Sequence, residues 1–584
     1  MILCDYFLNH MRKEGYKGSL KLDWINKHLS LYYEIDEKEG KGVRPVWVPK
    51  NDIRVAEPRI LRFVKNYGDS TSSNMLIKGD NLLVLRSLVE MFKGRPDKEK
   101  VKCIYIDPPF NTGAAFESYD DNLEHSEWLT MMRDRLFLLR KLLRKDGIIF
   151  VHLDTSETAY ARVLMDEIFG RLNYLNTICL TTNDPSGFKA TGGKIFSTAN
   201  YLLVYTRERI KNSLNKVFVE KEYDTAYSKV LINRTQDYKK WKWRNIADVV
   251  SENLGYENSR EAKRALGETF GAELAKYALK NASVVFRTAA IGGGALKKRL
   301  ATIEKSRTER DKVFVHPDED VSDFYILNGE GIVFYDRRII DIDGRRVPGE
   351  LLTDVWTDIS WTGIASEGDV KFKNGKKPEL LIKRVLELAT EQDDLVFDSF
   401  AGSGTTGAVA HKMGRRWLMV EMGRQTDELI IPRMQKVIAG KDQTGISKDT
   451  NWNGGGGFRH YQLGESVIHE QDMNWRLKAE EMAEAVFLHF QYHPIKAGWL
   501  KKENMYLGKH QSARYHFSLS FASREVKTIT AGLYEKIVAG LDKEKFKHLT
   551  IFTNVAVSVP PEALDDRVLV KKIPAAILRE YNLL

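Results

Sequence analysis

The sequence of 584 residues has little cysteine and no long hydrophobic run. Its three cysteines, Cys4, Cys103 and Cys179, stand far apart, which excludes a disulfide framework and suits a reducing compartment. His489 and His493 have the spacing of zinc ligands on a helix, but they lack an evident third ligand, so no metal site is predicted. No apolar run is long enough to cross a membrane, and the first residues do not resemble a signal peptide. We therefore expect a soluble, cytoplasmic protein.

The sequence also lacks a Walker motif, so we do not expect this chain to hydrolyse ATP. Basic residues, in contrast, are in excess: 90 Lys and Arg against 80 Asp and Glu give a formal net charge of +10, with a pI near 9.0. Such an excess suits a polyanionic partner such as nucleic acid. The chain is also too long for one hydrophobic core, and about three or four domains are expected.

A short loop motif follows a predicted buried strand at residues 101–106. It consists of Asp107, Pro108, Pro109 and Phe110. Two consecutive prolines fix φ, so the carbonyl groups of this loop stay aimed in one direction. The Asp107 carboxylate and the Pro108 carbonyl could then accept the two hydrogens of an exocyclic amino group, while the Phe110 ring stacks on a base flipped out of a duplex. An ordinary strand-ending turn, which Asp and Pro both favour, is the alternative.

A glycine-rich loop follows a second predicted strand, at residues 395–398. Residues 402–407, Gly-Ser-Gly-Thr-Thr-Gly, match the dinucleotide-binding pattern, and Glu421 ends the next predicted strand at about the spacing of a ribose-binding acid. By this pattern alone, NAD and S-adenosylmethionine fit equally well. Asp398 and Phe400 before the glycines, together with the Asp-Pro-Pro-Phe loop, for which hydride transfer has no use, favour S-adenosylmethionine.

The order of the two motifs, Asp-Pro-Pro-Phe first and Phe-x-Gly-x-Gly-Thr much later, resembles the β class of DNA amino-methyltransferases. Three further stretches, at 76–81, 358–364 and 374–379, resemble the modification (Mod) subunits of type III restriction-modification systems. The likeness runs from about residue 74 to 462. It implies an α/β fold: a circularly permuted Rossmann-like methyltransferase sheet with an inserted target-recognition domain and a C-terminal α+β region.

The resemblance assigns roles to particular residues. Catalysis would belong to the loop formed by Asp107, Pro108, Pro109 and Phe110. Residues from several other loops would bind the methionine part, the ribose or the adenine of S-adenosylmethionine: Asp80, Lys377, Asp398, Phe400, Gly402, Gly404, Thr405 and Glu421. For Asp80 and Lys377 the alternatives, a helix cap and a surface lysine, stay open.

The alternation of predicted helices and strands divides the chain into segments, because it stops near residue 207 and resumes only near Lys377. The predicted segments are an N-terminal extension at 1–70, the two halves of the methyltransferase domain at 71–207 and 351–440, an inserted target-recognition domain at 208–350, a glycine-rich connector at 441–459, and a C-terminal interaction domain at 460–584.

The predicted insertion contains a cluster of cations interleaved with aromatic rings: Lys240, Trp241, Lys242 and Trp243. Cations neutralise phosphates and rings can stack or wedge, so we expect these residues to contact DNA. The alternative is a solvated basic face with the two tryptophans in a local core.

The sequence thus predicts a site-specific methyltransferase that acts on adenine N6 in double-stranded DNA after base flipping, with S-adenosylmethionine as its cofactor. An Asp at the start of the loop favours adenine, since relatives that methylate cytosine N4 more often begin with Ser. By the same analogy we expect a homodimer and a helicase-nuclease restriction partner. The alternatives are an N4-cytosine or RNA methyltransferase on the same scaffold, and a catalytically silent DNA-binding subunit.

Overall fold

A computed structural model of the chain describes residues 20–36, 42–111, 124–182, 197–210, 213–316, 324–342, 344–370, 372, 375–469, 472–474, 476–478, 481–482, 484–486, 506–510, 513–517, 528–539, 548–553, 555–573 and 575–580. The chain divides into two compact units. The first comprises Met1–Asn215 and Asp354–Leu584, and the second comprises Lys216–Thr353.

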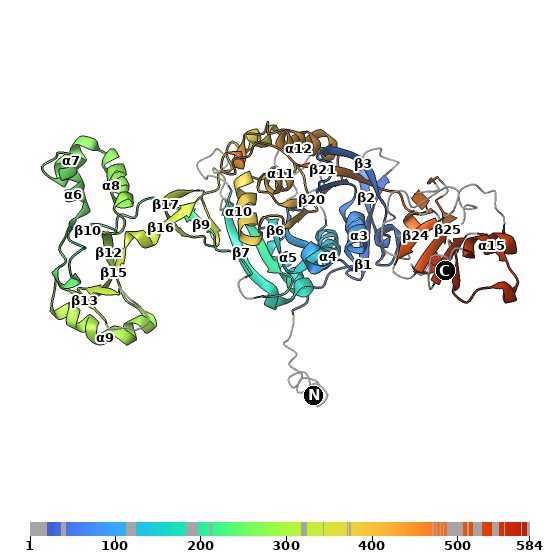
Figure 1. Ribbon diagram of the computed structural model, residues 1–584, viewed down its shortest axis with the longest axis horizontal. Helices are drawn as coiled ribbons and strands as arrows, with labels where there is room; N and C mark the ends of the chain where they lie inside the picture. The colour runs from blue at the N-terminus through green and yellow to red at the C-terminus, as the bar shows by residue number, and fades with distance from the viewer. Residues whose placement is uncertain are drawn as a thin grey trace, which may run out of the picture. The chain divides into compact units, whose positions relative to one another are not determined.

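The first unit is built on a ten-stranded mixed sheet (Figure 1). Its strands, in spatial order, are β18 (Val355–Trp356), β7 (Tyr174–Thr181), β8 (Ala199–Thr206), β6 (Leu143–Leu153), β5 (Val101–Ile106), β19 (Leu395–Asp398), β20 (Arg416–Glu421), β4 (Met75–Lys78), β21 (Gly457–Leu463) and β3 (Leu61–Gly68). The six strands from β6 to β21 run parallel to one another, whereas β8 and β3 are antiparallel to their neighbours.

Strands from distant parts of the sequence are neighbours at the centre of this sheet. β5 and β19 pair in parallel, with Val396 opposite Cys103 and Phe397 opposite Ile104. A parallel sheet with helical crossovers is the doubly wound arrangement. The α/β fold predicted from the sequence is therefore confirmed.

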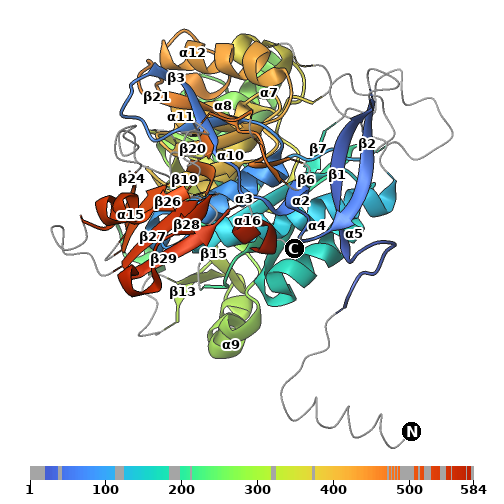
Figure 2. The same cartoon turned by 90° about the vertical axis from the view of Figure 1, so that its right-hand side faces the viewer.

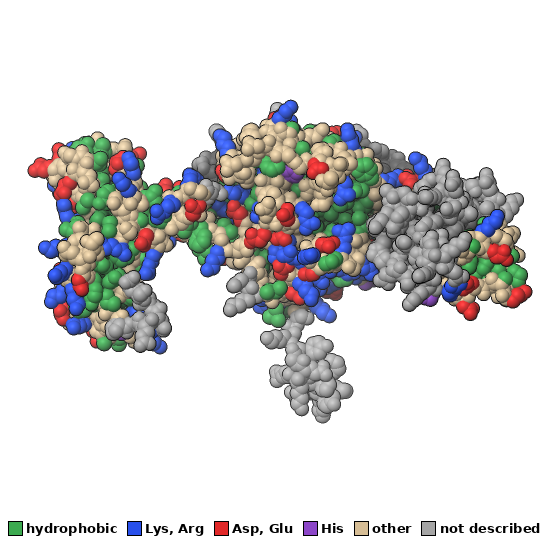
Figure 3. All heavy atoms as spheres, viewed as in Figure 1, with side chains coloured by type: hydrophobic (Ala, Val, Ile, Leu, Met, Phe, Trp, Pro, Cys, Tyr) green, Lys and Arg blue, Asp and Glu red, His purple; other side chains and the backbone are tan. Residues whose placement is uncertain are grey.

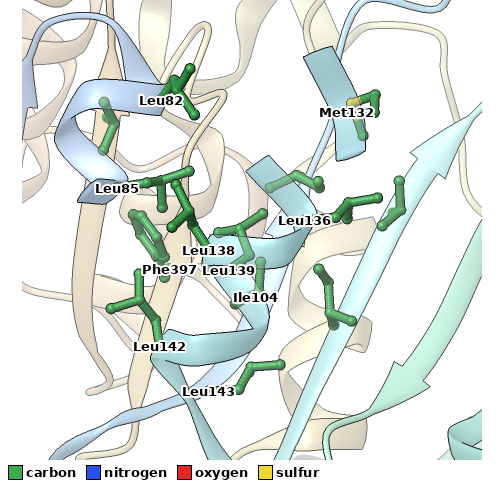
Figure 4. Close-up of a cluster of buried hydrophobic side chains, with 14 of the residues drawn as sticks. Leu82, Leu85, Ile104, Met132, Leu136, Leu138, Leu139, Leu142, Leu143 and Phe397 are labelled. Atoms are coloured by element: carbon green, nitrogen blue, oxygen red, sulfur yellow. The ribbon is translucent and has the colours of Figure 1, made fainter. Parts of the chain in front are cut away.

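Helices cover the faces of the sheet: α3 (Asn81–Phe92), α4 (His125–Leu142), α5 (Thr158–Met165), α10 (Glu379–Ala389), α11 (Thr405–Lys412) and α12 (Ile431–Ile438). In the core, Leu85 of α3 lies beside Phe397, and Leu139 of α4 lies beside Ile104 (Figure 4). Each such side chain contributes about 1.5–3 kcal/mol when fully buried. Among the described residues, no helix combines the length and the apolar character needed to cross a membrane.

Two strands at one edge of the sheet were predicted to lie outside it. β3 falls within the predicted N-terminal extension, and β21 overlaps the predicted glycine-rich connector. Gly457 pairs with Gly68, and the amide of Asp69 donates to the Gly456 carbonyl at 3.0 Å. A Cβ on Gly457 would lie 2.4 Å from the backbone nitrogen of Asp69, so this close approach requires glycine. The last glycine of the run therefore belongs to the sheet edge, and the three glycines before it lead directly into β21.

The first unit also contains smaller elements. Near its start, β1 (Leu29–Asp36) and β2 (Gly42–Pro49) form an antiparallel hairpin, seen in Figure 2, and α2 (Ile53–Ala56) follows it. The C-terminal region holds a four-stranded sheet and two short strand pairs. Its elements are β22 (Ile468–His469), β23 (Asp472–Met473), β24 (Tyr506–His510), β25 (Ala513–Phe517), β26 (Thr528–Thr530), α15 (Ala531–Val538), β27 (His548–Thr553), β28 (Ala556–Ser558), β29 (Val568–Lys572) and α16 (Ala575–Glu580). His489 and His493 lie outside the described residues.

The second unit covers nearly the same residues as the predicted insertion. Its six-stranded antiparallel sheet has the order β11 (Trp243–Asn245), β10 (Lys229–Leu231), β12 (Val285–Ala289), β15 (Glu330–Phe334), β14 (Tyr325–Leu327) and β13 (Val313–Val315). Helices α6 (Ile246–Asn253), α7 (Ser259–Leu266) and α8 (Thr269–Lys280) lie toward one end of this sheet, and α9 (Gly293–Thr308) lies toward the other (Figure 1).

A second, smaller sheet joins the beginning and the end of this unit. It consists of β16 (Ile339–Ile342), β17 (Arg345–Leu351) and β9 (Phe218–Glu220). β9 pairs antiparallel with β17, with Phe218 opposite Leu351. The first and last strands of the unit are thus hydrogen-bonded to each other.

Candidate active site

Four neighbouring strands bring the predicted site residues to one edge of the central sheet. Asp107 follows β5, Asp398 ends β19, Glu421 ends β20, and Asp80 follows β4 by two residues. Because these strands are parallel, their carboxyl ends meet at the same edge, which is where ligands of such sheets bind. The Asp-Pro-Pro-Phe loop and the glycine loop therefore emerge side by side.

The Asp-Pro-Pro-Phe loop is fixed by hydrogen bonds on both sides of Phe110. The indole nitrogen of Trp128 donates to the Pro109 carbonyl at 2.7 Å. Asn111 has a left-handed φ of 61° and donates its side-chain amide to Glu157 Oε1 at 2.8 Å. The Pro109 carbonyl is committed to Trp128, so the Pro108 carbonyl stays the candidate acceptor, as predicted.

Asp107 contacts a cation and a histidine. Its Oδ2 accepts a hydrogen bond from Lys377 Nζ at 2.5 Å, and its Oδ1 lies 3.8 Å from Nδ1 of His152. Lys377 Nζ also lies 5.1 Å from the centre of the Phe110 ring. Lys377 is only 9% exposed, so the surface-lysine alternative is wrong. A carboxylate, an ammonium group and an aromatic ring thus meet at one point.

His152 lies behind the catalytic loop and was not predicted. It is fully buried in β6, and the amide nitrogen of Asn200 lies 3.1 Å from its Nε2. Nε2 therefore accepts a hydrogen bond, and Nδ1 carries the proton toward the Tyr105 hydroxyl at 2.8 Å. Burial, with the charge of Lys377, holds the pKa of His152 well below its ordinary value, so the ring is neutral. The available signal was one polar residue inside a predicted buried strand.

Trp361 is a second aromatic residue that sequence reasoning left without a role. Its ring centre lies 6.2 Å from that of His152, and the Phe110 ring centre lies 5.6 Å from the same imidazole. The stretch that carries Trp361 is anchored where Arg384 of α10 donates two hydrogen bonds, of 2.9 and 2.7 Å, to Asp358. Two rings from distant segments thus flank the buried histidine near Asp107.

The glycine loop needs its glycines for conformation and for space. Gly402 and Gly404 have φ values of 53° and 75°, which side chains rarely tolerate. A Cβ on Gly404 would also lie 3.0 Å from the side chain of Ile430. Thr405 then begins α11, so the first amides of that helix face the end of the loop.

Asp398 holds the beginning of the same loop. Its two oxygens accept from the Phe400 amide at 2.9 Å and from the Thr406 hydroxyl at 2.6 Å. Burial is the main cause that raises the pKa of Asp398 to about 7; the negative charges of Asp107 and Glu421 add to it and the hydrogen bonds oppose it. This carboxyl group therefore takes up a proton near neutral pH.

The other two predicted acids differ in their surroundings. Glu421 accepts hydrogen bonds from the amides of Gly402 at 2.8 Å and Gly423 at 3.1 Å, so it ties two loops together. Asp80 caps α3 by accepting from the amides of Leu82 and Leu83. The helix-cap alternative for Asp80 is therefore correct, and its contact with a cofactor stays a prediction.

The residues around the glycine loop fit S-adenosylmethionine. Gly402 is half-buried and has no side chain, so a ligand could approach its backbone closely, and Glu421 offers a carboxylate at the position suited to ribose hydroxyls. Ser399 adds a hydroxyl group that is buried without a hydrogen-bond partner among the described residues. Buried polar groups are normally paired, so a polar ligand atom would satisfy this one.

A buried ion network supports the glycine loop from behind, and no sequence pattern indicated it. Arg433 donates to the Ser403 carbonyl at 3.1 Å, to the Thr405 hydroxyl at 2.9 Å and to Glu379 at 2.8 Å. Lys412 lies 2.9 Å from the same glutamate. These charges are almost completely buried, and removing one partner of such a pair destabilises a protein by about 3–5 kcal/mol.

The predicted DNA contacts in the second unit need one correction. Trp241 is buried among Tyr325 and Phe334, and its indole nitrogen donates to the Gln236 carbonyl at 3.0 Å. Its ring is therefore not available to stack on DNA, because it fills a local core, as the alternative foresaw. Trp243 is half-buried near Phe286.

The lysines of this cluster behave differently from its tryptophans. Lys240 and Lys242 are exposed, and Figure 3 shows other Lys and Arg side chains over the visible face of this unit. Contact between these cations and DNA stays a prediction.

Comparison with known proteins identifies the family. A family model described as DNA methylase, N6_N4_Mtase, matches residues 101–431, which is more than half of the chain. The chain belongs to this DNA methylase family. The matched range contains both the Asp-Pro-Pro-Phe loop and the glycine loop.

Several curated relatives of this DNA methylase are named as Mod subunits. The probable type III restriction-modification enzyme HindVI Mod subunit of Haemophilus influenzae is 32% identical over 68% of this chain and 55% of its own length. The StyLTI Mod subunit of Salmonella typhimurium is 26% identical over 65% of this chain and 55% of its own. The EcoPI Mod subunit of Escherichia phage P1 is 28% identical over 59% of this chain and 56% of its own length. The predicted resemblance is confirmed, and the chain spans about half the length of these relatives.

Proposed function

We propose that this DNA methylase transfers a methyl group from S-adenosylmethionine to N6 of adenine in double-stranded DNA after base flipping. One observation carries the proposal: β5 and β19 pair in parallel, which brings the loop with Asp107 beside the loop with Gly402 and Gly404. An acceptor for an amino group and a cradle for a cofactor therefore share one edge of the sheet. The names of the relatives support DNA as the substrate.

In this proposal the loop makes a poor nucleophile reactive. Asp107 and the Pro108 carbonyl accept the two hydrogens of the adenine amino group and turn its lone pair toward the methyl donor, while Phe110 stacks on the base. S-adenosylmethionine supplies an electrophilic methyl group on sulfur. The N6–carbon bond forms as the sulfur–carbon bond breaks, and the surplus proton leaves N6 afterwards. Neutral His152 supports Asp107 without adding charge.

The cofactor would be held by residues from three strand ends and from the start of α10. We assign the methionine part to Phe400 and to the glycine loop, which contains Gly402, Gly404 and Thr405; the ribose to Glu421; and the adenine to the region of Asp80. Asp398 would shape the loop from within, because it already binds the Phe400 amide. Lys377, just before α10, would meet the carboxylate of the methionine part.

We further propose that the protein is the modification subunit of a type III restriction-modification system. The relatives named as Mod subunits support this assignment. A helicase-nuclease restriction subunit would then be its partner, and a homodimer would share target reading and base flipping. The second unit would contact DNA through exposed cations such as Lys240 and Lys242.

Radiolabelling tests the reaction and the base together. Purified protein would be incubated with tritiated S-adenosylmethionine and unmethylated genomic DNA, beside the Asp107→Ala variant, and the DNA would be digested for mass spectrometry and sequenced. We expect N6-methyladenine in one sequence context from the wild type alone. N4-methylcytosine, or label only in RNA, would replace the proposed substrate. Absence of cofactor binding would favour the silent DNA-binding subunit.

A further inference from the structure

Lys377 contacts Asp107 and Phe110, the two residues that would bind the base in the proposed reaction. Its Nζ donates to Asp107 Oδ2 at 2.5 Å and lies 5.1 Å from the centre of the Phe110 ring. An amino group of a base that is stacked on Phe110 and bonded to Asp107 Oδ2 would compete with this ammonium group for the same oxygen. Withdrawal of Lys377 would leave this oxygen to the base.

The position of Lys377 in the chain shows where its side chain can go. It directly precedes Pro378 and the start of α10, where backbone amides and the helix dipole favour an anion. The neighbouring Lys376 is committed elsewhere, because its Nζ donates to the Val370 carbonyl at 2.9 Å and to the Glu367 carbonyl. Of these two adjacent lysines, it is therefore Lys377 that can turn toward a ligand carboxylate at this helix end.

We propose that Lys377 is a positioning residue that couples cofactor binding to base binding. It holds the Asp107 carboxylate until the carboxylate of the methionine part draws its ammonium group away. Asp107 then accepts the amino group of the base. This inference rests on the proposed function. A ligand shifts such an equilibrium only by its differential affinity for the two arrangements, and here the ligand's carboxylate supplies the difference.

The coupling makes an unusual prediction for Asp107→Asn. This substitution keeps the shape of the side chain but weakens its hold on Lys377, so a ligand that carries the methionine carboxylate should bind more tightly. S-adenosylhomocysteine is the suitable probe, because its neutral thioether removes any direct attraction between the sulfonium and Asp107. By calorimetry we expect its affinity to rise about threefold or more, within the range of couplings between contacting residues.

Three controls separate this coupling from a general change in the site. 5′-Methylthioadenosine lacks the amino-acid part, so its affinity should be the same for wild type and Asp107→Asn. In a protein that already carries Lys377→Met, adding Asp107→Asn should no longer raise the affinity for S-adenosylhomocysteine. Asp146→Asn is the matched variant, because Asp146 holds Lys102 at 2.8 Å near the opposite end of β5, and it should leave the affinity unchanged.

The binding measurements test the coupling through Lys377 and the proposed function separately. If Asp107→Asn leaves the affinity for S-adenosylhomocysteine unchanged or weakens it, Lys377 does not pass from Asp107 to the ligand and the coupling is wrong. If 5′-methylthioadenosine gains as much affinity as S-adenosylhomocysteine, the ligand carboxylate is not the cause, and the coupling is again wrong. If wild-type protein binds neither S-adenosylhomocysteine nor S-adenosylmethionine, the proposed function itself fails.

Discussion

The charged residues to which we assign roles differ in burial between the two units of this DNA methylase. In the first unit, Glu379, Lys412 and Arg433 are almost completely buried; Arg433 contacts the glycine loop directly, and Glu379 forms ion pairs with both cations. In the second unit, Lys240 and Lys242 point to solvent, and it is an aromatic ring nearby that is buried. Buried charges fix a geometry, whereas exposed cations attract phosphates without a fixed geometry. The proposed chemistry and the proposed DNA contact therefore depend on different physical properties.

The largest effect should come from removing the acceptor at the proposed reaction centre. Asp107→Ala should lower the rate of methyl transfer by about 100-fold to 1,000-fold or more, the effect of losing one preorganised polar group. DNA affinity should change little, because Asp107 engages the base only after flipping. Single-turnover transfer and gel-shift titration measure the two quantities. An equal loss of DNA binding would show that Asp107 is needed for folding.

The buried network should be the next most sensitive feature, and one substitution made in both units sharpens the comparison. Arg433→Met should lower the free energy of unfolding by about 3–5 kcal/mol, because Glu379 keeps its burial and loses a partner. Arg244→Met breaks the exposed ion pair with Glu252 in the second unit and should leave the urea transition unchanged. Similar effects of both substitutions would contradict the distinction between buried and exposed charges.

A pH dependence should come from Asp398. Its folded-state pKa of about 7 is raised from 3.8, so the folded protein retains a proton that the unfolded chain loses. The stabilising contribution is complete below about pH 4 and is lost as the pH rises through 7. Asp398→Asn lacks this dependence. Between pH 5 and pH 8 the difference in unfolding free energy, wild type minus variant, should fall by about 3 kcal/mol. A constant difference over this range would show that the carboxyl group does not titrate there.

The smallest effect should come from the surface of the second unit. Lys242→Ala should weaken DNA binding uniformly across sequences and reduce the slope of log affinity against log salt by about 1. Trp241→Ala, in contrast, should destabilise this unit by about 3–5 kcal/mol through the cavity it leaves. Salt titration and thermal unfolding separate the two. An unchanged salt slope for Lys242→Ala would remove this lysine from the DNA-contact surface.

Some features of the site could be predicted from sequence because they are local. The Asp-Pro-Pro-Phe loop and the glycine loop each directly follow an apolar strand, so their place at the edge of the sheet follows from the pattern. Both strands are present as predicted. The contact between Lys377 and Asp107 joins residues 270 positions apart, and no local pattern encodes it.

Other features were not predicted because they too depend on contacts between residues that are distant in the sequence. His152 looked like a core position because only its neighbours in space reveal what it binds. The ring of Trp241 is buried in the core of the second unit. A pattern of alternating cations and rings does not show which of these side chains face the core. The glycines before β21 resembled a linker because the close approach of another backbone is invisible in one sequence.

The pairing of β9 with β17 has a consequence for how relatives of this protein can diverge. The segment between these strands leaves and returns through two hydrogen-bonded neighbours, so its two ends stay together whatever lies between them. Among the residues of this segment that the structure describes, none forms a strand of the ten-stranded sheet. Recombination could therefore replace the segment with an unrelated one, provided that the new ends are equally close. With the second unit in its proposed role as the DNA-contacting part, such a replacement would change the target sequence in one step and leave the catalytic loops unchanged.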